Sequence, residues 1–280
     1  MMHAVKTLPG SDLDMSTDDK LKDFNVRSKH YGEYIKTYSD RKLYKEMFKP
    51  LEHLNLKATE VLDLGSGIGL SSIHLKNRVR NIYYLDYSYE MVSEGLKRGL
   101  IDANKVIIHD FAKGSLPFDE ERFDIVIARY CIHDVKEKTE LFAEISRVLR
   151  ANGLFQMVDM YAIDEISRSF YNKIHGWKTQ SGIPVDTFIE SLDAYRNLFE
   201  ESGMIVVSVS FYKSKVHTIE WVLENQITNE RRMFIEQMAL QEIKSHPSLK
   251  IVFGVRMSRG KGLYMEFPVV VMTGRKKLDT

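Results

Sequence analysis

The sequence predicts an α/β protein built on a doubly wound, mostly parallel sheet of seven strands. Over residues 60–158, short and nearly continuous apolar runs alternate with helical segments, as in parallel sheets that are covered on both faces. A turn with three glycines follows the first apolar run, where open α/β sheets bind their ligands. The 280 residues are 44% apolar and 28% charged, which is enough apolar material for one elaborated domain.

Strands are predicted from apolar runs that are too short for helices. Five of them belong to the alternating part of the chain and lie at residues 60–64, 82–85, 105–108, 123–128 and 154–158. Two more are expected near the C-terminus, at 204–212 and 263–274. Pro268 in the last run is typical of an edge strand or a bulge, because proline has no N–H to donate.

Helices are predicted where apolar residues recur every three to four positions. The first is expected from about Asp40 to Leu56, and Pro50 kinks or divides it because proline interrupts the hydrogen-bond ladder. The others are a short helix between the first two strands and the segments 89–99, 136–150, 186–202 and 217–247.

These elements divide the chain into two parts. Residues 1–22 have little periodicity and are expected to be a mobile lead-in. Residues 1–56 as a whole are expected to form a helical lead-in and lid, and residues 57–280 the α/β domain. The helical insertion at about 213–262 is expected to pack on the domain, and a wall of a substrate pocket is the alternative role for an insertion of this length.

Composition excludes several classes of protein. The net charge of +1 gives no broad attraction to nucleic acid or anionic lipid. The single cysteine, Cys131, excludes an internal disulfide framework and a cysteine-based zinc cluster, and no other metal site is expected. No apolar run is long enough to span a bilayer, and the polar start does not resemble a secretory signal. We therefore expect a cytoplasmic protein, either a monomer or a homodimer.

The run VLDLGSGIGL places glycines at Gly65, Gly67 and Gly69, which leaves the backbone open to a ligand. The dinucleotide fingerprint G-x-G-x-x-G would need its third glycine where Leu70 stands, and the absence of G-K-[ST] excludes a P-loop. Asp63 would repel a pyrophosphate but suits a ligand with a positively charged amino group. The turn is therefore interpreted as a site for a nucleotide-like ligand of another type.

Acidic residues also follow the next two predicted strands. Asp86 ends the second strand, where a carboxylate accepts hydrogen bonds from both hydroxyls of a ribose. Asp110 and Phe111 follow the third strand and offer an acceptor and an aromatic ring to an adenine. Because the carboxyl ends of parallel strands meet at one edge of the sheet, Asp63, Asp86 and Asp110 are expected to converge on one crevice.

Four runs of the chain together resemble the class I S-adenosylmethionine-dependent methyltransferases. They are VLDLGSGIG, LDYSYEM, HDFAKGSLPFDEERFDIVIARYCIHDV and EISRVLRANGLFQMVDM. Within that family the chain is most similar to the small-molecule branch that includes the ubiquinone and menaquinone C-methyltransferases, over residues 58–160. The resemblance implies a Rossmann-like fold, S-adenosyl-L-methionine as cofactor and S-adenosyl-L-homocysteine as product. One departure is the turn at 151–153, which reads Ala-Asn-Gly where the family usually shows Pro-Gly-Gly.

The resemblance also assigns roles to residues of the predicted crevice. It implies that the glycine loop meets the methionine half of the cofactor, that the second strand end holds the ribose and that the third holds the adenine. The residues carried over are Asp63, Gly65, Ser66, Gly67 and Gly69 for the loop, Asp86 for the ribose, Tyr87, Met91, Asp110 and Phe111 for the adenine, and Arg129 beside the methionine end.

Methyl transfer from a sulfonium is an in-line displacement, so alignment in a dry pocket supplies most of the catalysis. A general base is needed only where the nucleophile must first lose a proton. Tyr130, His133 and Asp134 follow the fourth strand and are the candidates. His133 is the first choice because imidazole titrates near neutral pH, with Tyr130 beside it.

Other segments are candidates for the walls of a substrate chamber. His175 and Trp177 lie in the segment after the fifth strand. Tyr31, Tyr34 and Tyr38 form an aromatic series before the first strand, for which two roles are open: a lid over the cofactor, or plain packing, which is the expected role of at least two of them.

Three functions remain open from the sequence. The first is transfer of a methyl group to oxygen, nitrogen or carbon of a small metabolite. The second is an RNA methyltransferase of the wobble-uridine type or a protein methyltransferase, for which the basic runs 213–215 and 256–262 would supply a patch. The third is a protein that binds S-adenosylmethionine without transferring its methyl group.

Overall fold

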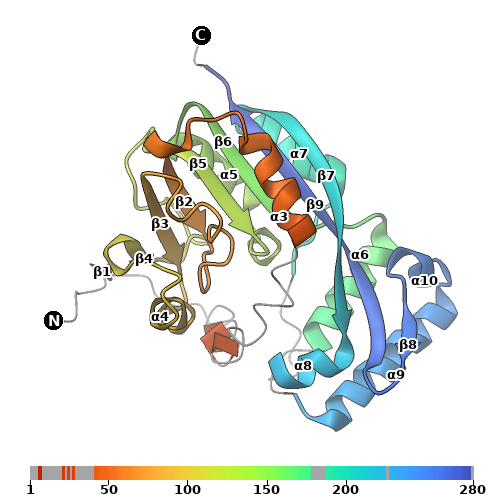
Figure 1. The fold of residues 1–280 in the computed structure, drawn as a ribbon. Helices are drawn as coiled ribbons and strands as arrows, with labels where there is room; N and C mark the ends of the chain where they lie inside the picture. Colours follow the sequence, from red (N-terminus) through yellow and green to blue (C-terminus); the bar gives the residue numbers. More distant parts are fainter. Residues whose placement is uncertain are drawn as a thin grey trace.

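A twisted sheet forms the centre of the computed structural model, and its strands follow the order β1-β4-β3-β2-β5-β6-β9-β7, with β8 paired to β9 (Figure 1). Neighbours from β1 to β6 are parallel, and β9 runs antiparallel to β6, β7 and β8. The predicted α/β class and mostly parallel sheet are confirmed. The residues that the structure describes are 6–7, 21–22, 24–25, 27–28, 41–177, 187–224 and 227–278.

Seven strands correspond to the predicted ones, and two short strands were not expected. These are β1, with two residues, and β8, with three, and strands this short show no periodic pattern in the sequence. β7 reaches His217, so the helices between β7 and β9 begin at Thr218 rather than at residue 213. The strands are β1 (Lys6–Thr7), β2 (Glu60–Leu64), β3 (Asn81–Asp86), β4 (Val106–Ile108), β5 (Phe123–Arg129), β6 (Leu149–Met160), β7 (Met204–His217), β8 (Arg256–Ser258) and β9 (Gly262–Lys276).

The helix predicted between β2 and β3 is wrong, because residues 66–80 form a series of turns. Gly69 has a φ of +88°, which a helix does not accommodate. Pro50 does divide the first predicted helix, since α3 ends at Phe48 and a 3₁₀ helix follows it.

In the described part of the chain, no helix combines the length and apolarity that crossing a bilayer requires. The α-helices are α3 (Arg41–Phe48), α4 (Tyr89–Lys97), α5 (Lys138–Val148), α6 (Glu165–Trp177), α7 (Leu192–Glu201), α8 (Thr218–Glu224), α9 (Asn229–Ser245) and α10 (Ser248–Val252), and the 3₁₀ helices are η2 (Lys49–Leu51), η3 (Leu56–Ala58), η4 (Ala103–Lys105) and η5 (Ile132–Asp134).

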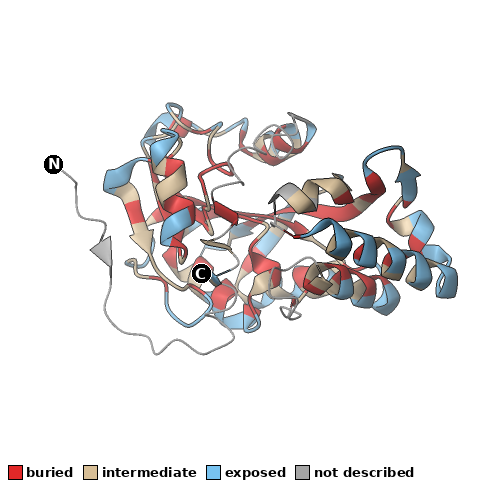
Figure 2. Ribbon diagram, turned by 90° about the horizontal axis from the view of Figure 1, so that it is seen from below, coloured by how far each residue is buried: buried red, intermediate tan, exposed pale blue. Residues whose placement is uncertain are grey.

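Both faces of the sheet are covered by helices, and alternation along each strand decides which face a side chain meets. In β2, Leu62 and Leu64 belong to the core under α5 and α7, whereas Val61 belongs to the core under α3 and α4. The buried sheet lies between helices whose outward sides are exposed (Figure 2). Asp63 therefore faces the α3 side of the sheet, beneath the turns that follow the glycine loop.

The strands β7 and β9 are longer than the others and run past the edge of the sheet as a ribbon that carries α8, α9 and α10 (Figure 1). A separate apolar core lies there, between α6, α9, α10 and the start of β9. Its members include Phe170, Phe253 and Phe267, whose rings contact one another. The ribbon thus holds a second small core beside the carboxyl end of the sheet.

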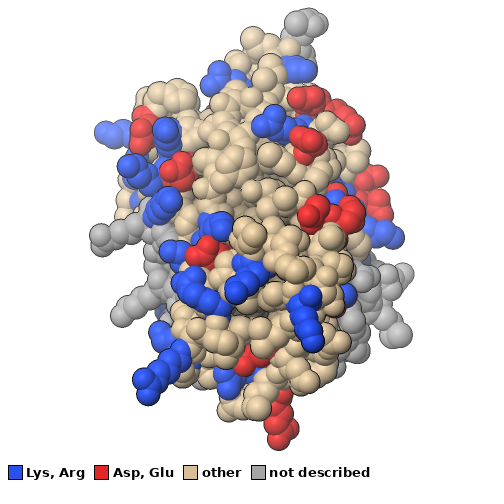
Figure 3. Space-filling model, turned by 90° about the vertical axis from the view of Figure 1, so that its right-hand side faces the viewer, with Lys and Arg blue, Asp and Glu red and all other residues tan. Residues whose placement is uncertain are grey.

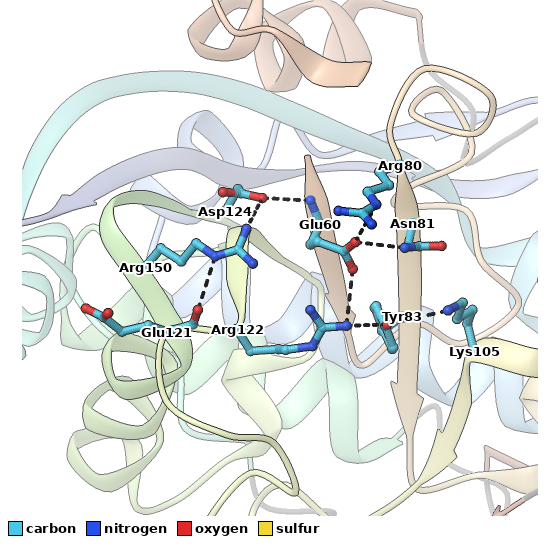
Figure 4. Close-up of polar contacts among 9 residues, drawn as sticks. All are labelled: Glu60, Arg80, Asn81, Tyr83, Lys105, Glu121, Arg122, Asp124 and Arg150. Atoms are coloured by element: carbon cyan, nitrogen blue, oxygen red, sulfur yellow. Dashed lines mark hydrogen bonds and ion pairs between the residues drawn. The ribbon is translucent and has the colours of Figure 1, made fainter. Parts of the chain in front are cut away.

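The amino end of the sheet is held by a charged cluster rather than by apolar contacts (Figure 4). Glu60 begins β2, and its carboxylate accepts a bond from Asn81 (2.8 Å) and lies 3.3 Å from Arg122. Its backbone N–H donates to Asp124 (2.8 Å), which also accepts from Arg150 (2.8 Å). These contacts join β2, β3, β5 and β6 at the edge opposite the carboxyl ends.

The face that carries α9 and α10 shows Lys and Arg side chains interspersed with Asp and Glu (Figure 3). Two lysines of the described residues are paired with acids, since Lys213 lies 3.3 Å from Glu266 and Lys173 lies 2.7 Å from Glu242. The two basic runs of the sequence lie on β7 and around β8, which both pair with β9.

We expect Phe199→Ala to lower the free energy of unfolding by about 3–5 kcal/mol, because a large buried ring would leave a cavity. Phe199 of α7 is fully buried and packs on Phe155 and Phe142, with ring centroids 5.1 and 5.2 Å apart. Urea unfolding followed by circular dichroism measures the change. Phe211→Ala, at a ring that is 54% exposed, is the matched control and should cost less than about 1 kcal/mol. Equal losses in the two variants would contradict this view of the core.

Candidate functional site

A cavity lies at the carboxyl ends of β2, β3 and β5, where the sequence predicted a crevice. It encloses about 1420 Å³ of empty space, including the part that opens to solvent. Its first wall is the glycine loop with the ends of β3 and β5. The facing wall comes from α6, from the far half of β7, from α8 and from the start of β9. The ribbon that carries the helical insertion therefore does form part of a pocket wall.

The glycine loop turns away from β2 and is held against β3. The backbone N–H groups of Gly65 and Ser66 donate to the carbonyl of Leu85, at 2.9 and 3.1 Å. Gly65 has a φ of +65°, and a Cβ there would lie 2.7 Å from the sulfur of Cys131, so no other residue fits. The buried Ser66 hydroxyl lines the cavity and has no hydrogen-bond partner among the described residues.

Asp86 connects the end of β3 to the glycine loop. One carboxylate oxygen accepts from the backbone N–H of Gly67 (2.7 Å) and the other from that of Ser88 (2.9 Å). Burial raises the pKa of Asp86 from 3.8 to about 6, and the backbone donors oppose that shift. A carboxylate offers about four lone-pair sites, and the backbone donors at Gly67, Ser88 and Tyr87 occupy three of them, so Asp86 keeps acceptor capacity toward the cavity that it lines.

Asp63 does not line the cavity, although the sequence placed it in the crevice. Its carboxylate is fully buried under the loop and accepts from the Ser72 hydroxyl at 2.6 Å. Burial raises the pKa of Asp63 from 3.8 to about 7. In this arrangement Asp63 supports the turns after the loop from below.

The side predicted to hold the adenine is only partly assembled around the cavity. Tyr87, Met91 and Phe111 line it. Asp110 does not, because its carboxylate turns back to accept from the N–H of Ala112 at 3.1 Å. Gly69, also predicted for the cofactor, contributes no wall either.

Arg129 lies at the end of β5 and is held by the first helix. Its guanidinium donates to the Tyr44 hydroxyl (3.0 Å), which in turn donates to the carbonyl of Leu70 (2.8 Å). The guanidinium also lies over the rings of Tyr44 and Tyr130, 5.2 and 5.3 Å from their centroids. The next residue, Tyr130, has a φ of +55°, which is unusual for a bulky residue. The chain turns at this point, and Tyr130 lines the cavity.

His133 is buried at the cavity wall, and a carboxylate that the sequence analysis missed orients it. Asp159, at the end of β6, lies 2.6 Å from Nδ1 of the imidazole and also accepts from the backbone N–H of His133 (3.0 Å). Asp134 lies on the other side, 3.6 Å from Nε2. Asp159 lies at the end of a buried strand, as Asp63 and Asp86 do, so the pattern that led to those two acids could also have led to Asp159.

Two aromatic rings of α6 lie directly beside His133 in the cavity wall, with centroid distances of 5.8 Å to His175 and 6.4 Å to Tyr171. Tyr171 and His175 of α6 have nearly parallel rings with centroids 5.9 Å apart, and Phe267 of β9 meets Tyr171 edge-on. Trp177, predicted with His175, packs on Phe234 instead. Tyr31, Tyr34 and Tyr38, predicted as a lid, lie outside the described residues. The remaining wall residues were not predicted. Four of them lie within the quoted runs and are Ile68, Leu70, Cys131 and Met160. The others come from segments without a motif and are Phe24, Arg27, Ser71, Ile174, Ser214, Lys215, Val216 and Glu220.

The central part of the chain is similar to known methyltransferases. Residues 62–157 match the sequence model of a family described as a methyltransferase domain. That match covers about a third of the chain, from the glycine loop to the middle of β6. The resemblance to class I methyltransferases drawn from the sequence motifs is thereby confirmed.

Three relatives illustrate the range of that similarity. The chain is 25% identical to the uncharacterized methyltransferase YcgJ of Bacillus subtilis over 58% of this chain and 63% of the relative. It is 30% identical to a phosphatidylethanolamine N-methyltransferase of Cereibacter sphaeroides over 40% of this chain and 56% of the relative. It is 33% identical to the ubiquinone/menaquinone biosynthesis C-methyltransferase UbiE of Xylella fastidiosa over 37% of this chain and 43% of the relative. The alignments thus span about half the length of these relatives.

The fold is also that of a solved relative. The crystal structure of Bacillus subtilis YcgJ superposes with a TM-score of 0.71 at 20% identity and covers 86% of this chain and 100% of that one.

We expect Asp63→Asn to stabilise the protein above pH 7 and to have little effect near pH 4. The folded-state pKa of Asp63 is raised, so the wild type loses stability as pH rises toward about 7, whereas the amide stays neutral. The difference in free energy of unfolding at pH 8.5 should approach a few kcal/mol, with about 4 kcal/mol as the upper bound. Urea unfolding at pH 4.5, 7 and 8.5 measures it.

Asp193→Asn, at an exposed position in the first turn of α7, is the control and should change stability by less than about 0.5 kcal/mol at each pH. A difference between Asp63→Asn and wild type that does not vary with pH would contradict the assignment of a raised pKa.

Proposed function

We propose that this chain, whose residues 62–157 form a methyltransferase domain of the class I type, binds S-adenosylmethionine and transfers its methyl group to a small molecule. One observation carries the proposal above the others. The buried carboxylate of Asp86 joins the glycine loop to the end of β3 and keeps acceptor capacity toward the cavity. That is the arrangement a ribose beside a close-approaching backbone requires.

The residues around the cavity fit this cofactor. The Ser66 hydroxyl is buried without a partner among the described residues, which leaves one polar group for a ligand to satisfy. Gly65 and Gly67 leave a surface without side chains beside it. Asp86 would accept from the ribose, Tyr87, Met91 and Phe111 would enclose the adenine, and Ser66 with its neighbours would hold the methionine part.

When bound, S-adenosylmethionine supplies a methyl group on a positively charged sulfur, which a nucleophile displaces in line. The chain's own contribution is to align the acceptor and to exclude water. Tyr130 and His133 lie on the cavity wall between the glycine loop and α6, where an acceptor would meet the cofactor. The Arg129–Tyr44 contact keeps this wall closed on the side of α3.

We assign the acceptor to the small molecules because the cavity is enclosed by the ribbon and its helices. Phe267, Val216 and Met160 give it an apolar side, while Lys215 and Glu220 add charge at the far end. The names of the relatives cover transfer to nitrogen of a phospholipid and to carbon of a quinone. Oxygen, nitrogen and carbon of a metabolite are all compatible with that range.

We expect Asp86→Ala to weaken S-adenosylmethionine binding by at least about 100-fold, because charge-assisted hydrogen bonds contribute about 1.5–3 kcal/mol each. Isothermal titration calorimetry measures the dissociation constant, and circular dichroism verifies the fold. Asp110→Ala should have a smaller effect, since Asp110 does not line the cavity, and Asp193→Ala should have none. An unchanged affinity in Asp86→Ala would refute the proposed site.

The acceptor class is tested separately. Purified protein is incubated with S-adenosylmethionine labelled in the methyl group and with the small-metabolite, RNA and protein fractions of a cell extract. Label in the metabolite fraction supports the proposal. Label in RNA or protein alone would favour the second function drawn from the sequence, and tight binding without any transfer would favour the third.

A further inference from the structure

The segment from Lys244 to Lys261 carries charge of one sign only. It contains five lysines and arginines and no aspartate or glutamate, whereas the whole chain has a net charge of +1. The segment runs from the end of α9 through α10 and β8, at the end of the ribbon that lies away from the sheet (Figure 1). Positive charge is therefore concentrated at one end of a molecule whose total charge is close to zero.

The packing of α10 turns part of this segment outward. Leu249 and Phe253 are buried in the same small core as Ile235 of α9. They are four residues apart and share one side of the helix, so Ile251, midway between them, lies on the opposite side. Lys250 and Ile251 are both exposed.

The hairpin that joins β8 to β9 presents two more cations. Ser258 pairs with Gly262, and the Ser258 carbonyl accepts from the backbone N–H of Lys261 at 3.1 Å. Arg259 and Lys261 lie in the turn and are exposed, as is Met257 just before it. The exposed residues on these adjoining elements form a surface that we call the basic tip and that consists of Lys244, Lys250, Ile251, Met257, Arg259 and Lys261.

The four cations of the basic tip form no ion pair with any described residue. Three acids of α9 and β9 have other basic partners, at 2.7 Å for Glu242, 3.2 Å for Glu236 and 3.3 Å for Glu266. The charge of the tip is therefore directed to solvent, where an anionic surface would be attracted to it.

Strongly exposed apolar side chains stand among these cations. Ile251 is 81% exposed and Met257 is 63% exposed. On α9, Met233 and Leu240 lie at helical spacing on the same exposed side as Lys244. An anionic bilayer is complementary to both features, because its phosphates attract basic side chains and the boundary with its acyl chains takes up apolar ones.

Two other partners fit this surface less well. Single-stranded RNA stacks its bases on exposed aromatic rings, but the only phenylalanine, tyrosine or tryptophan between Lys244 and Lys261 is Phe253, which is buried. A second copy of the chain in a two-fold contact would bring the same cations face to face, which like charges oppose.

We propose that the basic tip docks on the surface of an anionic phospholipid bilayer. Its four cations lie against the headgroup phosphates, and Ile251 and Met257 enter the boundary between headgroups and acyl chains. This surface is separate from the cavity, since none of the six residues lines it. Docking goes beyond the proposed methyl transfer and does not rest on it, because it needs neither cofactor nor acceptor.

The first test is co-sedimentation of the full chain with vesicles of phosphatidylcholine, either pure or with about one third phosphatidylserine. We expect binding to the anionic vesicles only, and a steep fall in binding between about 0.05 and 0.5 M salt. The triple variant Lys250→Gln/Arg259→Gln/Lys261→Gln should weaken the partition by about 100-fold, since each basic residue near the bilayer contributes about fivefold.

The matched control removes the same charges elsewhere, from exposed positions in η3, α4 and α7. This variant, Lys57→Gln/Lys97→Gln/Arg196→Gln, should bind within about twofold of the wild type, because charges far from the bilayer are screened. Circular dichroism verifies that both triple variants are folded. Equal losses of binding in the two variants would overturn the proposal.

A second test addresses the apolar part of the contact. Ile251→Ser should lower the partition by at least about fivefold, since it removes hydrocarbon from the bilayer boundary. Ile205→Ser, at a side chain on β7 that is 54% exposed, is the control and should leave the partition unchanged. The same partition in Ile251→Ser and in the wild type would overturn the insertion of Ile251.

The other partners are outcomes of the same experiment. A wild type that binds neither kind of vesicle overturns the proposal. In that case, polyuridylate binding that the triple variant of the tip loses would assign the surface to RNA. A sedimentation coefficient that falls from dimer to monomer in that variant would assign it instead to a second copy of the chain.

Discussion

The structure depends on one constraint, which is that the central strands are buried on both faces and admit charge only at their ends. Along β2 and β5 nearly every side chain is buried, so a carboxylate there needs fixed donors. Backbone N–H groups of the turns after each strand supply them. Asp86 accepts from Gly67 and Ser88, and Asp159 accepts from His133 and Met160. The cavity is the space between these satisfied strand ends.

The two ends of the sheet solve the same problem in different ways. At the amino end, arginines pair with Glu60 and Asp124 and the Asn81 amide adds a hydrogen bond, so the acids are balanced within the protein (Figure 4). At the carboxyl end Asp86 and Asp159 meet backbone donors, and Asp86 keeps acceptor capacity toward the cavity. The contacts at the amino ends of the strands therefore stabilise the sheet, whereas the carboxyl ends offer polar groups to a ligand. The ribbon of β7 and β9, together with α6, then faces that second end, with Phe267 from β9 and Tyr171 from α6 among the residues of the wall.

Much of the fold and the position of the cavity at the carboxyl ends of the strands followed from the sequence, because local chemistry decides them. The apolar runs specified the strands of the parallel sheet, and the helix after the glycine loop failed because Gly69 and the serines bonded near Asp63 favour turns. Asp159 shows a different kind of limit. It follows the same pattern of an acid at a strand end, but its partner His133 lies on another strand's loop, 26 residues away.

The sequence by itself determined the α/β class, the glycine loop and the acids at the strand ends, since strand burial and backbone conformation are local properties. Only the tertiary structure decided which of those acids reach the cavity. Strand alternation turns Asp63 toward α3, where Ser72 holds it beneath the loop, and brings Asp159 against His133. The ring of Tyr171 in α6, which lies beside His133, contacts Phe267 of β9, about a hundred residues further along the chain. No pattern in the sequence predicts that contact.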